Sequence, residues 1–494
     1  MRIISNSILF VMMMLVFPMT TGMMIGMHYP QSAFAPSQSA TLEDVPFVWQ
    51  EINGFCNWAA TSSALQYIGV DLDLAAVFAA TTVGFSYAYY KYNDSLLTYP
   101  GVIYKQVEPT QFLSELYGVN YTVYVGENLP GGDHAQQLWE NEGINVGRIS
   151  GQTDALALMR NTIDQGYPLL VSVDPMWLPT ADYDYLRERG LSGGGHAILI
   201  VGYNNTEGTA TIIDPGVGSF GDQYGYPDNG RGNYTTISYS QLSTAWSSRY
   251  YISELLQPGP EPDQDISDSL APAIRDKLLG VGSSYAPSSS SAFLWSFGEG
   301  AFRKMSEDLA PSSIREFLTI FDGLENEHAF KAAALVFMGI GIESSLTLQY
   351  LSFRTAAQAL PKIIPQIDET DFSASSAEAV FSMSALSSNS TLIYPGNVSR
   401  IDGLVSSTFA DISAEFNSTG NLESSLESYS DDLSVISDYL DQTADAWLEA
   451  GNEISKIWPS SPLSAMAPYI AIGGIIVVFI VAGIWYYIFK KPTQ

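Results

Sequence analysis

The 494-residue chain contains a single cysteine, Cys56, and this limits how the chain can be held together. One cysteine cannot form an intrachain disulfide, so each folded part must be stabilised by the packing of its own core. A chain of this length can form two or three such cores. We therefore expect several packed domains rather than a small scaffold held by disulfides.

The first 35 residues are predicted to be a signal peptide or an uncleaved N-terminal anchor. Arg2 precedes an apolar run over residues 8–17, which is the order of charge and hydrophobicity found in export signals. Ala33-Phe34-Ala35 has the small-x-small pattern of a cleavage site, although Pro36 after it is unfavourable for signal peptidase. Both outcomes place the following residues on the far side of a membrane.

A transmembrane helix is predicted at residues 467–489. This stretch has no charged residue, and at about 1.5 Å rise per residue it spans a bilayer core of about 30 Å. The alternative is a buried core helix. Because Lys490 and Lys491 follow directly, the positive-inside rule makes residues 490–494 a cytoplasmic tail and predicts a single-pass protein of the cell membrane with its bulk extracellular.

The charge of the chain restricts its partners. The formal net charge is −31, and so acidic a surface repels phosphate backbones, which argues against nucleic-acid binding. Histidines are few and scattered, so no metal site is predicted. No other cofactor is predicted either. Acceptor tripeptides for N-glycosylation lie in the part predicted to be exported and begin at Asn93, Asn120, Asn204, Asn233, Asn389, Asn397 and Asn417.

Residues 43–256 are predicted to form an α+β domain in which a helix carrying Cys56 packs on an antiparallel sheet. The helix is expected from Cys56 to about Ile68, with Gly69 at its end. The sheet is expected from the β-branched, apolar stretches 121–125, 168–173, 197–202 and 209–213, the last two joined by a hairpin turn.

The rest of the exported part is predicted to be different in kind. Residues 257–264 are a Pro-rich linker by composition, and residues 265–460 are Ser-rich and mostly helical. The part of this region nearest the predicted membrane helix carries an apolar stripe with steps of four and three residues. It indicates one helix of a small bundle or, alternatively, a stalk or dimerising coiled coil. The stripe consists of Leu422, Leu426, Tyr429, Leu433, Ile436, Leu440, Thr443 and Trp447.

Side chains suited to thiol chemistry occur in a fixed order along the α+β domain. A lone cysteine is most often an inert core residue, but Asn53-Gly54 upstream is expected to cap a helix, which would place Cys56 at its N-terminus and favour the thiolate. His196 follows three glycines and is the candidate base. Asp214 is expected to orient the imidazole through Nδ1, the alternative being an ordinary turn. Gln50 is the candidate oxyanion donor, the alternative being a solvated loop residue.

These segments resemble the papain-like cysteine peptidase superfamily, and most of all its bacteriocin-leader (double-glycine) peptidase branch. The similarity lies in residues 45–50 with the cysteine helix, in the histidine strand 196–203, and in the aspartate turn 213–215. Residues 173–179 and 84–87 are also similar to the N-terminal domain of the butirosin-biosynthesis protein H type, whose members transfer acyl groups. The resemblance implies a catalytic set of Cys56, His196, Asp214 and Gln50.

One departure from the branch concerns the substrate. Leader peptidases usually have Gly-Pro after the cysteine, whereas Asn57-Trp58 follows here and would narrow the cleft. The leading hypothesis is a membrane-anchored extracellular cysteine peptidase acting on a peptide or protein substrate. The alternatives are an acyltransferase of the same fold and a binding or adhesion ectodomain that has lost catalysis.

Overall fold

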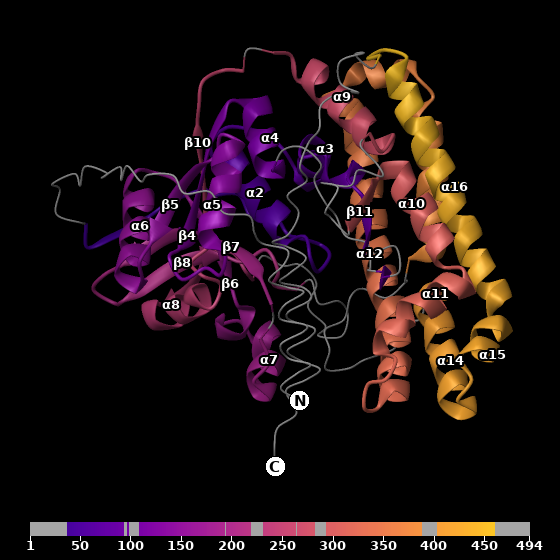
Figure 1. Cartoon of the computed structure of the whole chain (residues 1–494). Helices are drawn as coiled ribbons and strands as arrows, with labels where there is room; N and C mark the ends of the chain where they lie inside the picture. The colour runs from indigo at the N-terminus through magenta and orange to yellow at the C-terminus, as the bar shows by residue number, and fades with distance from the viewer. Residues whose placement is uncertain are drawn as a thin grey trace.

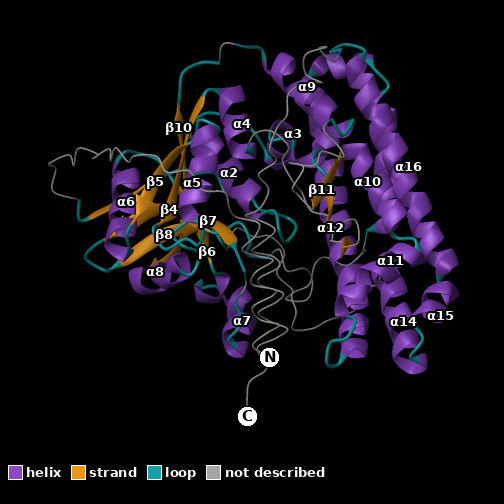
Figure 2. Ribbon diagram, viewed as in Figure 1, coloured by secondary structure: helices purple, strands orange, loops and turns teal. Residues whose placement is uncertain are grey.

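The computed structural model describes residues 37–92, 96–97, 108–192, 194–218, 231–262, 264–281, 293–387 and 403–459. The predicted export segment, transmembrane helix and cytoplasmic tail lie outside these ranges. A sheet with its own helices occupies one side of the molecule and a bundle of long helices the other (Figures 1 and 2). The α+β prediction and the mostly helical character of the later region are therefore confirmed.

The larger sheet has the order β5-β4-β10-β6-β7-β8-β9, with β1 paired to β7. All described neighbours are antiparallel except β4 and β5, which are parallel, so the prediction of an antiparallel sheet was wrong at that edge. The strands are β1 (Ser39–Thr41), β4 (Val119–Gly126), β5 (Asn145–Ile149), β6 (Leu169–Val173), β7 (His196–Asn204), β8 (Thr209–Ile213), β9 (Thr235–Ser238) and β10 (Ser253–Pro258).

Strand β7 lies inside the sheet and is buried along nearly its whole length. A strand covered on both faces reads as a continuous apolar run, which is what the Ala197–Val201 stretch shows. Helices with local start signals surround the sheet: Asp73, Glu108 and Ser238 each accept a backbone N–H at the start of a helix. They are α2 (Cys56–Tyr67), α3 (Leu74–Ala80), α4 (Pro109–Tyr117), α5 (Gly132–Asn141), α6 (Gln152–Asp164), α7 (Asp184–Arg189) and α8 (Tyr239–Ser247).

The later region is a bundle built around the long helix α12 (Glu327–Ile363), which packs against α13 and α14. Within the described ranges α12 is the helix long and apolar enough to cross a membrane, yet here it serves as the central helix of the bundle. The remaining helices are α9 (Ile266–Leu278), α10 (Gly298–Asp308), α11 (Pro311–Leu318), α13 (Phe372–Leu386), α14 (Leu404–Thr419), α15 (Leu422–Ser428) and α16 (Ser430–Ser455).

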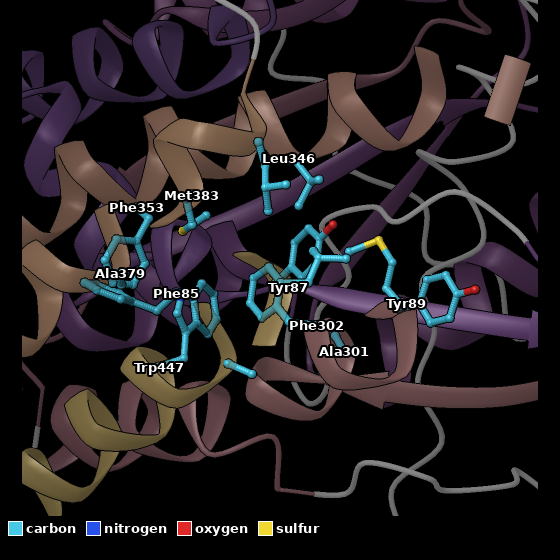
Figure 3. Packing of buried hydrophobic residues seen from close by; sticks show 14 of the residues in the cluster. Phe85, Tyr87, Tyr89, Ala301, Phe302, Leu346, Phe353, Ala379, Met383 and Trp447 are labelled. Atoms are coloured by element: carbon cyan, nitrogen blue, oxygen red, sulfur yellow. The ribbon is translucent and has the colours of Figure 1, made fainter. Parts of the chain in front are cut away.

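The bundle core begins before the linker. Helix α3, the 3-10 turn η1 (Val83–Phe85) and strand β2 (Ala88–Tyr92) extend from the sheet into the bundle, where β2 pairs with β11 (Phe293–Phe297) and with the short strand β3 (Leu96–Leu97). Figure 3 shows Phe85 and Tyr87 among side chains of α10, α12, α13 and α16. Tyr87 stacks on Phe302 with ring centroids 4.4 Å apart. The chain boundary at the linker is therefore not a boundary between two cores.

Close backbone contacts fix this junction. A Cβ on Gly84 would lie 2.2 Å from the Cβ of Ala356 and 2.8 Å from the carbonyl oxygen of Ser352, so only glycine allows η1 to approach α12 so closely. Gln349 of α12 donates its side-chain amide to the Gly84 carbonyl at 2.7 Å, and both groups are buried. The Tyr89 hydroxyl donates to Asp308 of α10 at 2.9 Å.

Two further expectations need correction. Gln257 and Pro258, predicted to begin the linker, are the last residues of β10, because Pro258 is paired with Val119 and its carbonyl accepts from the Asn120 side chain. The apolar stripe toward the membrane is not one helix, because the chain breaks at Tyr429 between α15 and α16. The stripe does lie in a bundle, since α16 packs against α9, α10 and α13.

Candidate active site

Cys56 is the first residue of helix α2. The expected position at a helix N-terminus is confirmed, but the capping residue is Phe55, which makes no side-chain cap bond, and not Asn53 or Gly54. The first amides of the helix and its dipole face the sulfur region and favour negative charge there. Cys56 keeps part of its surface accessible, as a nucleophile requires.

His196 and Asp214 come together because β7 and β8 are antiparallel neighbours. His196 is the first residue of β7 and Asp214 directly follows the last residue of β8. The His196 Nε2 lies 2.7 Å from Asp214 Oδ1, with both residues buried. The expectation that Asp214 would bind Nδ1 was therefore wrong: Asp214 holds Nε2, which leaves Nδ1 as the ring nitrogen for Cys56.

Cys56 and His196 change each other's pKa. Burial by itself raises the pKa of the Cys56 thiol, but the charge of His196, their side-chain hydrogen bond, and backbone N–H groups of Ala197 and Asn57 lower this pKa. Burial likewise lowers the pKa of His196, but the charges of Asp214 and Cys56 and the hydrogen bonds with both raise it to about 10. Both shifts favour a thiolate beside an imidazolium over the neutral form of the pair.

Gln50 is buried rather than solvated, with 1% of its surface exposed. Its backbone N–H donates to the carbonyl of Pro215 at 3.1 Å, which ties it to the turn that carries Asp214. Nearby, the Trp49 indole donates to the Val217 carbonyl. The segment before the cysteine helix is thus bonded to the aspartate turn, which places Gln50 next to the residue that follows Asp214.

Of the described glycines before His196, Gly195 makes the close approach that the sequence suggested, and its neighbour is Arg249, whereas a Cβ on Gly194 would meet open space. A Cβ on Gly195 would lie 2.8 Å from Nη2 of Arg249. Burial lowers the pKa of Arg249, and the charge of Asp174, at the end of β6, opposes that shift. A guanidinium with a carboxylate beside it therefore lies next to the start of the histidine strand.

Sequence reasoning missed Tyr183, the last residue of the 3-10 turn η3 (Ala181–Tyr183). Its hydroxyl donates to Asp214 and lies 3.3 Å from His196 Nε2. No regular periodicity or motif marks this residue, because it lies in an irregular segment between β6 and β7. Its buried neighbour Asp182 forms a two-pronged ion pair with Arg231, at 2.9 and 3.1 Å.

No group of histidine, cysteine and acidic side chains suited to a metal ion occurs among the described residues. The groups that the structure brings into contact at the site are a thiol, an imidazole and a carboxylate. Residues 42–245 match the family described as "Peptidase_C39 like family". Residues 42–245 form a C39-like peptidase domain. The comparison with curated proteins gave no match.

The C39-like domain accounts for 204 residues (245 − 42 + 1) of the 494 in the chain. The site residues Gln50, Cys56, His196 and Asp214 all lie within it. The bundle helices α9 to α16 lie outside the matched range, although they share a core with part of the C39-like domain.

Proposed function

We propose that this chain is a membrane-anchored extracellular cysteine peptidase that works through a thioester acyl-enzyme. The observation that carries the proposal is the pairing of Cys56 with His196, whose other ring nitrogen lies 2.7 Å from Asp214. A thiolate at a helix N-terminus, next to an imidazolium that a buried carboxylate orients, is the arrangement that nucleophilic acyl transfer requires.

The acylation step follows from the placement of these groups. The Cys56 thiolate attacks the carbonyl carbon of the scissile peptide bond, a C–S bond forms, and the carbonyl π electrons move to oxygen. The Gln50 carboxamide and the Cys56 backbone N–H donate to that oxyanion. The oxyanion then collapses, the C–N bond breaks, and the His196 imidazolium gives its proton to the departing amine.

Deacylation reverses the roles. The neutral imidazole takes a proton from water as the water oxygen attacks the thioester carbon. The tetrahedral intermediate then releases the carboxylic acid as the C–S bond breaks, which restores the thiolate and the imidazolium. Asp214 keeps the ring oriented throughout and is not itself consumed.

The location of the enzyme is part of the same proposal. The apolar run near the N-terminus supports export, and the uncharged stretch 467–489 followed by Lys490 and Lys491 supports a C-terminal anchor with the tail in the cytosol. The acceptor tripeptides, such as those at Asn120 and Asn204, support a glycoprotein. The predicted partners are therefore a peptide or protein substrate outside the cell and the membrane that holds the chain.

The test is iodoacetamide labelling of the full-length protein in detergent across pH. Because Cys56 is the sole cysteine, every labelled molecule reports on it. Labelling that is already fast at pH 6 and is slowed at least tenfold by His196→Ala supports the pair. His134→Ala is the matched control, since His134 lies on the surface of α5 and should leave the rate unchanged.

Substrate cleavage is then measured on a peptide library with Cys56→Ala as the blank. Hydrolysis lost in the blank supports a peptidase. Products joined to an added amine instead of water identify the acyltransferase alternative. Labelling that rises only near the free-thiol value of about 8.5 and ignores His196→Ala refutes thiol catalysis and leaves the binding-ectodomain alternative.

A further inference from the structure

The Tyr183 hydroxyl contacts both His196 and Asp214, the buried pair of the C39-like domain. It donates to Oδ1 and Oδ2 of Asp214, at 3.2 and 3.1 Å, and its oxygen lies 3.3 Å from Nε2 of His196. The Tyr183 side chain is fully buried, and its ring centroid is 5.9 Å from that of His196.

Gly216 closes the other side of this arrangement. Its backbone N–H donates to Asp214 Oδ1 at 2.8 Å. A Cβ at this position would lie 2.6 Å from Cε1 of His196 and 2.9 Å from the Tyr183 hydroxyl, so a larger residue would push the two rings apart. The chain therefore has a glycine where the hydroxyl, the imidazole and the carboxylate meet.

The neighbouring residue fixes Tyr183 relative to the aspartate turn. Asp182 accepts both Nη atoms of Arg231 and the backbone N–H of Gly218, the latter at 2.8 Å. These bonds attach η3 to Gly218 and to Arg231, which both follow Asp214 in the chain. As a result, η3, which carries Tyr183, is bonded to the part of the chain that follows Asp214.

We infer that Tyr183 is a positioning residue whose hydroxyl holds the Asp214 carboxylate against His196 and withdraws part of its charge, so that the imidazolium can release its proton during turnover. This inference rests on the proposed function. Tyr183 acts through Asp214 and touches no substrate.

The sign of the effect follows from the hydrogen-bond lengths. The proton on Nε2 lies on the 2.7 Å bond to Asp214, so the 3.3 Å contact with the hydroxyl oxygen is the weaker one. The main effect of the hydroxyl is therefore its donation to the carboxylate, which reduces the attraction between Asp214 and the imidazolium. Without that donation His196 should hold its proton more tightly, and the deacylation step, which needs neutral imidazole, should slow.

The other charged groups near His196 stay the same in this comparison. Cys56 faces the ring from α2, Asp214 from the end of β8, and Tyr183 from η3. Arg249, with Asp174 beside it, lies against Gly195. Replacing Tyr183 by phenylalanine removes one hydroxyl and leaves each of these in place.

The matched control is Tyr203→Phe. Tyr203 lies on β7, the strand that begins with His196. Like Tyr183 it is almost fully buried, and its hydroxyl also donates to a carboxylate, that of Asp164, at 2.6 Å. It lies at the far end of the strand from His196. Both substitutions remove a tyrosine hydroxyl bonded to an aspartate, but only the Tyr183 hydroxyl belongs to the site.

The experiment follows the four histidines of the full-length protein in detergent by 13C labelling and NMR, with His196 assigned by His196→Ala. In the wild type the His196 signal should titrate with a midpoint near the pKa of about 10. In Tyr183→Phe we expect that midpoint to rise by about one pH unit, a tenfold change, so that at the wild-type midpoint roughly nine tenths of the molecules remain imidazolium. Tyr203→Phe should titrate like the wild type.

The outcomes separate this inference from the proposed function. A wild-type midpoint near 10 with Tyr183→Phe unchanged or shifted downward overturns the role of Tyr183 alone. A wild-type His196 that titrates near its ordinary value of 6.5 overturns the proposed function and this inference with it. If Tyr183→Phe does not fold, 3-fluorotyrosine at position 183 keeps the ring and makes the hydroxyl a stronger donor. The midpoint should then fall below that of the wild type, and an unchanged or higher midpoint overturns the inference.

Discussion

Gly84→Ala tests whether the C39-like domain and the bundle share one core. The backbone of η1 at Gly84 is not in the left-handed region, so alanine meets no backbone strain there and slightly restricts the unfolded chain. The cost must come from packing. The new methyl would lie 2.2 Å from the Ala356 Cβ, whereas carbon atoms in contact stay about 3.5 Å apart, so η1 and α12 must separate by about 1.3 Å.

The magnitude has two parts. Overpacking of this kind costs about 1–3 kcal/mol. The separation also stretches the 2.7 Å bond from Gln349 to the Gly84 carbonyl, and leaving buried polar groups underpaired costs about 1–3 kcal/mol more. We therefore expect Gly84→Ala to lower the free energy of unfolding by about 2–6 kcal/mol, a large share of the stability of a typical domain, about 5–15 kcal/mol.

The assay is chemical denaturation of the full-length protein in detergent with two probes. Helical circular dichroism reports mainly on the bundle. The fast alkylation of Cys56 at pH 6, which is lost when unfolding separates Cys56 from His196, reports on the C39-like domain. Both should shift together in Gly84→Ala. Gly151→Ala is the control: a Cβ there meets open space at the N-cap of α6, and the substitution should cost no more than about 1 kcal/mol.

A double-mutant cycle with Ala356→Gly then isolates the contact. Ala356→Gly alone should cost about 1 kcal/mol through helix propensity, but combined with Gly84→Ala it removes the nearest clashing atom. The coupling energy should favour the double variant by at least about 1 kcal/mol. Two outcomes would refute the shared core: a Gly84→Ala variant that loses less than about 0.5 kcal/mol, or one that shifts the helical signal while fast alkylation of Cys56 persists as in the wild type.

Two further predictions concern the site. Asp182→Asn should destabilise the protein by about 3 kcal/mol in denaturant titrations, because it breaks an ion pair whose carboxylate is buried, whereas Asp445→Asn, in the exposed pair with Arg303, should cost less than about 1 kcal/mol; equal losses would contradict the structural role of Asp182. In a Cys56→Ser background, His196→Gln should cost more stability at pH 6 than at pH 10.5. The pKa of His196 is raised in the folded state, so its charge contributes stability that is complete below the unfolded value of 6.5 and is lost as the pH rises through the folded value, about 10 when Cys56 is present. A cost that is independent of pH would contradict the pairing of His196 with Asp214.

The placement of Cys56, His196 and Asp214 could be predicted because each depends on local signals. The hairpin composition between the strands at 197–202 and 209–213 makes them antiparallel neighbours, so the end of the second strand must return beside the start of the first. The glycines before His196 and the short helix after Gly54 were equally local features. What could not be read in this way was the ring nitrogen that Asp214 binds, since that depends on the orientation of the imidazole.

Features that depend on contacts between distant parts of the chain were missed. Strand β2 pairs with β11, about 200 residues away in the sequence. The sequence of neither strand indicates which strand it will pair with. Tyr183 lies in an irregular turn whose position depends on Asp182 and Arg231. The stripe from Leu422 to Trp447 kept its apolar spacing across the break at Tyr429, so periodicity alone could not show that two helices share it.

The close packing at Gly84 decides whether the chain can be divided at the linker. In a chain whose C39-like domain had a complete core of its own, the aromatic side chains of that domain would be covered by the domain itself. Cutting such a chain at the linker would release a folded domain. Here a shortened chain ending at residue 258 would leave Phe78, Phe85 and Tyr87 uncovered, because their surroundings in the bundle come later in the sequence. We therefore expect that fragments produced by cutting the chain at the linker expose this apolar surface and aggregate.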